Sequence, residues 1–159
     1  MKKNKLGASK ATVNGIQFDS KFEAQTYEAF LILEQEGFAR NIELQSPITI
    51  IPTFHFGRTT QRPCRIIVDF KLEALVNGEW VEVYFETKGY QTDLSKLKVK
   101  LLKFLKKDLR TAGLFTYVLF HGGIKKNIDD QVYAVRKAIC VGVLGNKGYE
   151  EVYGKSGEQ

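Results

Sequence analysis

The spacing of hydrophobic residues divides the chain into short strands and longer helical segments. Over residues 20–36 the apolar positions recur at the three- and four-residue steps of a helix. These positions are Phe22, Ala29, Phe30 and Leu33. Asp19 or Ser20 stands where a capping residue is expected, and Gly37 stands where the helix would stop. This segment is therefore predicted to be the first helix.

Two Asn-Gly pairs, Asn14-Gly15 and Asn77-Gly78, predict tight hairpin turns. The first pair lies within ATVNGIQF, which predicts a small hairpin or extended arm. The second connects the strand-like runs CRIIVDFKLEAL and EWVEVYFETKG. Another run, IELQSPITIIP, precedes them across the loop PTFHFGRTTQRPCR, which contains two prolines. The three runs together predict a β-meander.

Residues 93–110 have the spacing of a second helix with two stripes. The apolar stripe, expected to pack inward, is Leu94, Leu97, Leu101, Phe104 and Leu105. The basic stripe is Lys96, Lys100, Lys103, Lys107 and Arg110. A stripe of this kind is either an ordinary solvated helix face or a rail that follows DNA phosphates.

The remaining patterned segments complete an α/β fold. GLFTYVLF, residues 113–120, is an apolar run of the length of a buried strand and is expected inside the sheet. A third helix is predicted from Asn127 onward, with Ile128, Val132, Val135 and Ile139 facing inward. The order of helix, three strands, helix, strand and helix favours a mixed sheet flanked by helices.

The length of 159 residues, with 43% hydrophobic content, fits one domain. We expect that domain to span residues 1–144, with residues 1–10 as a flexible basic arm. Residues 145–159 are polar and glycine-rich, which predicts a tail outside the core. The chain shows neither a signal-peptide pattern nor a membrane-spanning run, so we expect a soluble protein of the cytoplasm. Cys64 and Cys140 have no ligand-spaced partner, which argues against a zinc site.

A net charge of +6 and a pI near 9.2 indicate a polyanionic partner, although many basic proteins simply have solvated basic faces. The candidate chemistry lies in Asp69, Glu86 and Lys88. If the two strands joined by the Asn77-Gly78 turn pair, Asp69 and Glu86 lie near each other at one end of the sheet. Two ionised carboxylates repel unless a cation lies between them, and Mg²⁺ suits such a site. The alternative is a surface cross-strand ion pair worth ~0.2–1 kcal/mol.

Glu23 has two interpretations. The sequence Ser20-Lys21-Phe22-Glu23 matches a capping box, in which Glu23 reaches back to the first amide of the helix. A carboxylate in the first turn of a helix packed on the sheet can equally complete a metal shell. The sequence leaves both roles open.

The segments SKFEAQ, IIVDF and YFETKG resemble the PD-(D/E)XK nuclease superfamily. The arrangement is similar to that of endonuclease I type Holliday-junction resolvases and TnsA-type transposition endonucleases. It is similar also to short phage and prophage proteins placed in that superfamily. The similarity covers about residues 10–120 and implies a restriction-endonuclease-like sheet flanked by helices.

Position by position, the resemblance implies that Glu23, Asp69, Glu86 and Lys88 are the catalytic residues. Asp69, Glu86 and Glu23 are then metal ligands, together with the backbone carbonyl of Thr87. The implied cofactor is Mg²⁺, with Mn²⁺ as a substitute. Val68 stands where the family pattern has a proline, and the separation from Asp69 to Glu86 is longer than in compact members.

The sequence therefore predicts a Mg²⁺-dependent DNA endonuclease of phage or prophage DNA replication or recombination, acting on branched DNA if the resolvase likeness holds. Its candidate phosphate contacts are Arg58, Arg62, Arg65, Lys96, Lys100, Lys103 and Lys107. Resolvases cut two strands, which implies a homodimer, with the last helix as a candidate interface. The rival hypotheses are a noncatalytic DNA-binding or replication-assembly protein that keeps the fold, and a structural domain whose carboxylates are surface charges.

Overall fold

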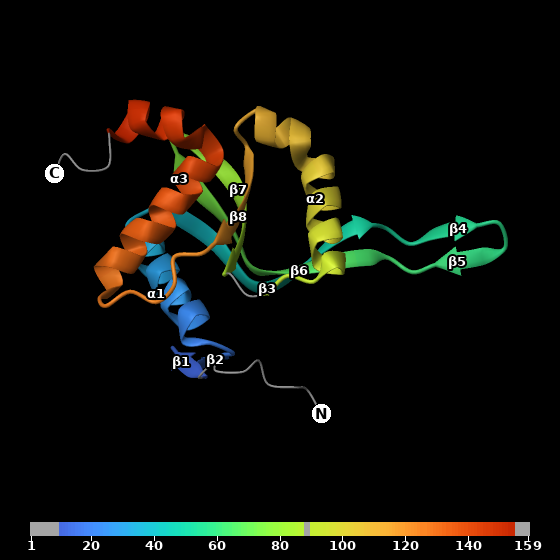
Figure 1. Ribbon diagram of the computed structural model, residues 1–159, viewed down its shortest axis with the longest axis horizontal. Helices are drawn as coiled ribbons and strands as arrows, with labels where there is room; N and C mark the ends of the chain where they lie inside the picture. The colour runs from blue at the N-terminus through green and yellow to red at the C-terminus, as the bar shows by residue number, and fades with distance from the viewer. Residues whose placement is uncertain (1–9, 88–89, 155–159) are drawn as a thin grey trace.

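The computed structural model describes residues 10–87 and 90–154. Within them, a four-stranded mixed sheet has the order β3-β6-β7-β8 (Figure 1). β3 (Ala39–Ile51), β6 (Cys64–Val76) and β7 (Glu79–Thr87) are antiparallel neighbours, whereas β8 (Phe115–Phe120) runs parallel to β7. The predicted α/β architecture, a mixed sheet flanked by helices, is confirmed. The flexible arm predicted for residues 1–10 lies outside the described residues except for Lys10.

Both Asn-Gly pairs form the predicted hairpins. β1 (Ala11–Val13) and β2 (Ile16–Phe18) pair across Asn14-Gly15, and β6 and β7 pair across Asn77-Gly78. Each Asn has a φ near +50° and each Gly a φ near +80°, the left-handed pair that a type I′ turn requires. The loop predicted between β3 and β6 contains a further hairpin, β4 (Phe54–Phe56) with β5 (Thr59–Gln61), which extends away from the sheet (Figure 1).

The larger core lies between one face of the sheet and two helices, α1 (Lys21–Gln35) and α3 (Ile128–Tyr153). The ring of Phe30 from α1 lies 5.1 Å from both the Phe70 ring of β6 and the Phe85 ring of β7. All three side chains are essentially inaccessible to solvent. Alternate residues of β6 from Phe70 to Val76, and of β7 from Val81 to Phe85, direct their side chains into this core. Ile66 and Val68, at the start of β6, pack instead on the other face of the sheet.

α3 is longer than the sequence predicted. The helix is interrupted at Gly145, where φ is +74°, and helical structure then resumes to Tyr153. Tyr149 is buried in the larger core, so the part of residues 145–159 that the structure describes is not simply a polar tail. The apolar contacts of Tyr149 explain the difference, because they compensate for ordering this polar segment. Within the described residues, every helix is too short or too polar to span a lipid bilayer.

α2 (Asp93–Thr111) packs on the opposite face of the sheet through a different side from the one predicted. Val99 and Leu102 are its buried residues, whereas Leu97 is 53% and Phe104 65% exposed. The smaller core that receives them contains Ile50, Ile66, Val68, Tyr84 and Phe115. The predicted apolar stripe was therefore wrong as an inward face. The reason is that apolar residues cover a broad arc of this helix, and the sheet contacts only one side of that arc.

β8 also differs from its prediction. The run was expected in the interior of the sheet, but β8 is an edge strand with β7 as its neighbour. Phe115 faces the smaller core under α2, whereas Val118 and Phe120 face the larger core. Coverage by helices on both faces makes an edge strand as apolar as a central one, so hydrophobicity did not distinguish the two positions.

The side of α2 that faces the sheet can be tested by two matched substitutions. Leu102→Ala removes a buried side chain and is expected to lower the free energy of unfolding by about 2–5 kcal/mol. Leu97→Ala, five residues earlier on the exposed side, is expected to change it by less than about 0.5 kcal/mol. Urea unfolding followed by circular dichroism measures both. Equal losses of stability would show that α2 packs as the sequence stripe suggested.

Candidate functional site

The register between β6 and β7 brings Asp69 next to the end of β7. Phe70 lies opposite Phe85, which places Asp69 beside Glu86 on the next rung. The backbone N–H of Thr87 donates to Asp69 Oδ2 at 2.9 Å, and the Thr87 hydroxyl donates to the same oxygen at 2.8 Å. These two hydrogen bonds hold the Asp69 carboxylate against the last residues of β7.

Gln45 holds the other oxygen of Asp69 and was not anticipated from the sequence. Its side-chain amide donates to Asp69 Oδ1 at 3.2 Å from the neighbouring strand β3. Gln45 has a φ of +48° inside that strand, a left-handed conformation that is costly for a residue with a side chain. A single polar residue in a strand-like run gives no signal of either feature. The strained backbone therefore accompanies a residue that orients a candidate site carboxylate.

Glu86 is half-buried on the sheet face that α2 covers. Burial raises the pKa of its carboxyl above the usual 4.5; the nearby Tyr117 hydroxyl lowers this pKa, and the negative charge of Asp69 raises it further. Within the described residues, Glu86 and Asp69 form no ion pair with a Lys, Arg or His side chain. A carboxylate in this setting favours either a proton or a metal cation.

Tyr117, on β8, is a second neighbour of the carboxylates that sequence reasoning missed. Its hydroxyl is buried and makes no hydrogen bond of standard geometry within the described residues. The hydroxyl is nevertheless close enough to Glu86 that each group shifts the pKa of the other. Burial and the Glu86 charge raise the pKa of Tyr117, so this side chain is a neutral donor at physiological pH. The only sequence signal was a tyrosine in an apolar run.

Glu23 lies in the first turn of α1, at the same end of the sheet as Thr87. The Phe22 ring is 5.5 Å from the Phe120 ring, and Phe120 is the register partner of Thr87. The Glu23 N–H donates to the Ser20 hydroxyl at 3.1 Å, which is one half of the predicted capping box. Within the described part of the chain, no three His, Cys, Asp or Glu side chains gather into a metal-binding group.

The structure thus brings Asp69, Glu86 and Thr87 together, whereas within the described residues Glu23 does not complete a metal-binding group with the two carboxylates. Lys88, the predicted catalytic lysine, lies outside the described residues.

One residue of the basic stripe of α2 lies near Tyr117. Four of its lysines, Lys96, Lys100, Lys103 and Lys107, are exposed. Lys103 Nζ lies 5.2 Å from the centre of the Tyr117 ring, which connects the stripe to the surroundings of Glu86. The other predicted member of the stripe, Arg110, donates to the Val143 carbonyl at 3.0 Å and so fastens α2 to α3.

The three predicted arginines lie outside α2. Arg58, Arg62 and Arg65 are exposed on the β4–β5 hairpin and at the start of β6. None of them forms an ion pair with a described residue. Their charges are therefore available to an anionic partner.

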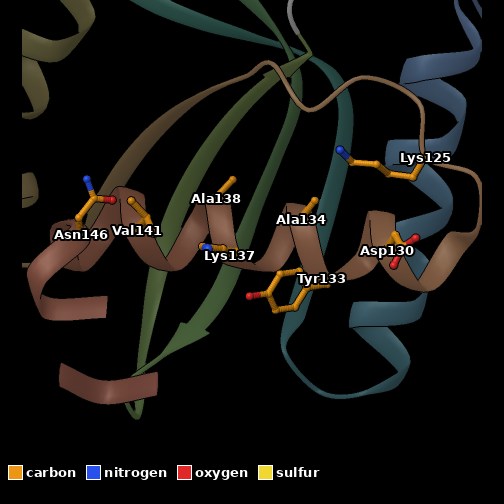
Figure 2. A pocket seen from close by; sticks show the side chains of 8 residues that line it. All are labelled: Lys125, Asp130, Tyr133, Ala134, Lys137, Ala138, Val141 and Asn146. Carbon is orange, nitrogen blue, oxygen red and sulfur yellow. The ribbon is translucent and has the colours of Figure 1, made fainter. Parts of the chain in front are cut away.

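A shallow hollow on α3 is unrelated to these residues (Figure 2). It is lined by Lys125, Asp130, Tyr133, Ala134, Lys137, Ala138, Val141 and Asn146. The lining mixes charged and apolar side chains from α3 and the loop before it, and contains none of the candidate site residues.

Comparison with known proteins gives a family. The family model described as "Protein of unknown function (DUF1064)" matches residues 3–118. The chain belongs to the DUF1064 family. The DUF1064 match includes Glu23, Asp69, Glu86 and Thr87 and ends within β8, so that α3 lies beyond it. No curated protein and no solved structure matches the chain.

The raised pKa of Glu86 makes the stability of the fold depend on pH. A carboxyl with a higher pKa in the folded chain stabilises the fold while protonated, and this contribution disappears as pH rises through the folded pKa. Glu86→Gln removes the ionised form. Its free energy of unfolding, measured without divalent metal, is therefore expected to rise relative to the natural chain between about pH 4 and 8.

Glu79→Gln, on an exposed position of the same strand, is the matched control and is expected to show no such pH-dependent difference. A constant difference between Glu86→Gln and the natural chain across this range would contradict the proposed environment of Glu86.

Proposed function

We propose that the protein is a Mg²⁺-dependent DNA endonuclease of the PD-(D/E)XK type that hydrolyses phosphodiester bonds in phage or prophage DNA. The observation that carries the proposal is the adjacent pair Asp69 and Glu86 at the end of β7. Burial and mutual repulsion disfavour two negative charges there, and a divalent cation relieves both. The resemblance of the segments around Glu23, Asp69 and Glu86 to that superfamily supports the same assignment.

The donor set suits a hard cation. Asp69 and Glu86 offer carboxylate oxygens, and the Thr87 carbonyl follows directly on the strand. Gln45 and the Thr87 N–H and hydroxyl would orient Asp69, as outer hydrogen bonds commonly orient metal ligands. A bound Mg²⁺ would supply an activated water and neutralise charge on the leaving oxygen. The resemblance gives Lys88 the role of steadying negative charge at the scissile phosphate.

The basic surfaces fit the same proposal. Lys103 lies over the Tyr117 ring and the other stripe lysines are exposed on the same helix, so α2 can hold phosphates near the carboxylates without reading sequence. A branched substrate and a homodimer with two such sites follow from the likeness to resolvases. A noncatalytic DNA-binding protein would share the basic surfaces but would have no use for the paired carboxylates.

Cleavage with matched variants tests the enzyme. The natural chain is expected to cut supercoiled or four-way-junction DNA with Mg²⁺ or Mn²⁺, and to be inactive in EDTA. Glu86→Gln is expected to lower the cleavage rate by at least about 10²-fold, because it removes a group that acts on charge in the transition state. Glu79→Gln on the same strand should cut normally.

Thermal unfolding with and without Mg²⁺ provides a second readout. Mg²⁺ is expected to raise the melting temperature of the natural chain and of Glu79→Gln, and to raise that of Glu86→Gln by less. Lack of metal-dependent cleavage on every DNA form would defeat the enzyme proposal. Normal cutting by Glu86→Gln would show that the site is misplaced.

The lysine rail has a separate test in the salt dependence of DNA binding. The double variant Lys100→Ala/Lys103→Ala is expected to reduce the slope of log K against log salt by about 2, or about 0.9 for each phosphate that is no longer neutralised. Lys147→Ala, also exposed but in the helical segment after Gly145, should leave the slope unchanged. Fluorescence anisotropy titrations at several salt concentrations measure both. Equal slopes for all three proteins would remove α2 from the DNA interface.

A further inference from the structure

The β4–β5 hairpin has no packing partner within the described part of the chain. It extends beyond the sheet as a two-stranded ribbon (Figure 1), and every residue from 51 to 60 is exposed. An isolated ribbon of this kind is only marginally stable in water. Its length and isolation indicate a role in contacting another molecule.

The charge of the hairpin selects the kind of molecule. Residues 44–68 contain no Asp or Glu, whereas Arg58, Arg62 and Arg65 lie on or beside the ribbon. A segment of this length with only positive charge complements a polyanion.

The exposed aromatic residues of the hairpin indicate which kind of polyanion it binds. Phe56 is 76% and Phe54 45% exposed, and they stand two residues apart on one strand, so both rings project from the same face. His55 lies between them and its ring contacts the Thr60 hydroxyl at 3.2 Å. Exposed aromatic rings beside arginines suit a ligand that has both phosphates and flat apolar faces, which describes a nucleic acid with accessible bases.

We propose that the β4–β5 hairpin is a DNA-contacting arm whose Phe54 and Phe56 stack on bases exposed at a branch point, bulge or strand end. Arg58, Arg62 and Arg65 contact the flanking phosphates. The proposal rests on DNA being the ligand of the proposed function, and it adds the surface and the residues that would recognise exposed bases. In an intact duplex the rings would first have to unstack bases, which costs energy at each step. At a branch the bases are already accessible, so the arm favours branched over continuous DNA.

The test measures binding in EDTA, where no cleavage occurs. A four-way junction carrying 2-aminopurine at its branch point and an intact duplex of the same length are titrated with each protein. The natural chain is expected to bind the junction more tightly and to change the 2-aminopurine fluorescence. Phe54→Ala/Phe56→Ala is expected to lose on the order of 10-fold in junction affinity for each ring, together with the fluorescence change.

The affinity of this double variant for intact duplex should change less than about 2-fold, because the arginines remain. Tyr133→Ala removes a comparably exposed ring, 56% exposed on α3, and should behave as the natural chain. Phe56→Trp should retain the fluorescence change, since a larger ring also stacks.

The outcomes separate the two proposals. Junction binding that survives removal of both phenylalanine rings, or an equal decrease on intact duplex, overturns the stacking role even if the natural chain cuts DNA. Phenylalanine-dependent junction binding without metal-dependent cleavage supports the arm and removes the nuclease. Failure of the natural chain to bind either DNA overturns both.

Discussion

Phe70 lies opposite Phe85 where β6 and β7 pair, and the core and the carboxylate site both depend on this register. A slip of one residue would turn every side chain of one strand to the other face. The two rings would then leave the Phe30 contact, and Asp69 would lose its hydrogen bonds to Thr87. Apolar burial on one face of the sheet therefore fixes the position of the carboxylates on the other. The energy that keeps them together comes from the core, which is why two repelling charges can be held side by side.

α2 connects the parallel strands β7 and β8, and different sides of this helix have different surroundings. Val99 and Leu102 pack on the sheet, and Lys106 pairs with Glu82 at 3.0 Å while lying 5.5 Å from the centre of the Tyr84 ring. These contacts set the rotation of the helix about its axis. Lys103 is consequently directed over the ring of Tyr117, a neighbour of Glu86. The exposed apolar residues of α2 therefore do not determine the orientation of the helix on the sheet.

The sequence predicted the features that depend on local pattern. The turn at Asn77 needs a residue that tolerates positive φ, and the Asn-Gly pair meets this need. Because this short turn fixes how β6 and β7 pair, the sequence alone predicted that Asp69 lies near Glu86. Features that depend on a distant partner could not be predicted. The inward side of α2 and the edge position of β8 are decided only in the assembled sheet. Gln45 lies on β3, which is connected to its neighbour β6 through the β4–β5 hairpin. Tyr117 lies on β8, which is connected to its neighbour β7 through the helix α2. The sequence therefore does not indicate which side chains of the neighbouring strands these two polar residues contact.

The arm and Asp69 belong to the same pair of strands, β3 and β6. β3 and β6 pair from Ala39↔Ala74 to Ile51↔Cys64, and the hairpin continues directly from their far end. Arg65 is four residues from Asp69 on β6, a span of about 13 Å at the rise of a β-strand. One DNA strand has a phosphate for each 3.4 Å or so of helix axis, so this span corresponds to roughly four nucleotides. In the proposed nuclease, a phosphate on Arg65 and the phosphate to be cleaved can thus belong to the same short stretch of DNA. A base stacked on the proposed DNA-contacting arm would then lie several nucleotides from the proposed cleavage position, at a separation set by the continuous backbone of β6.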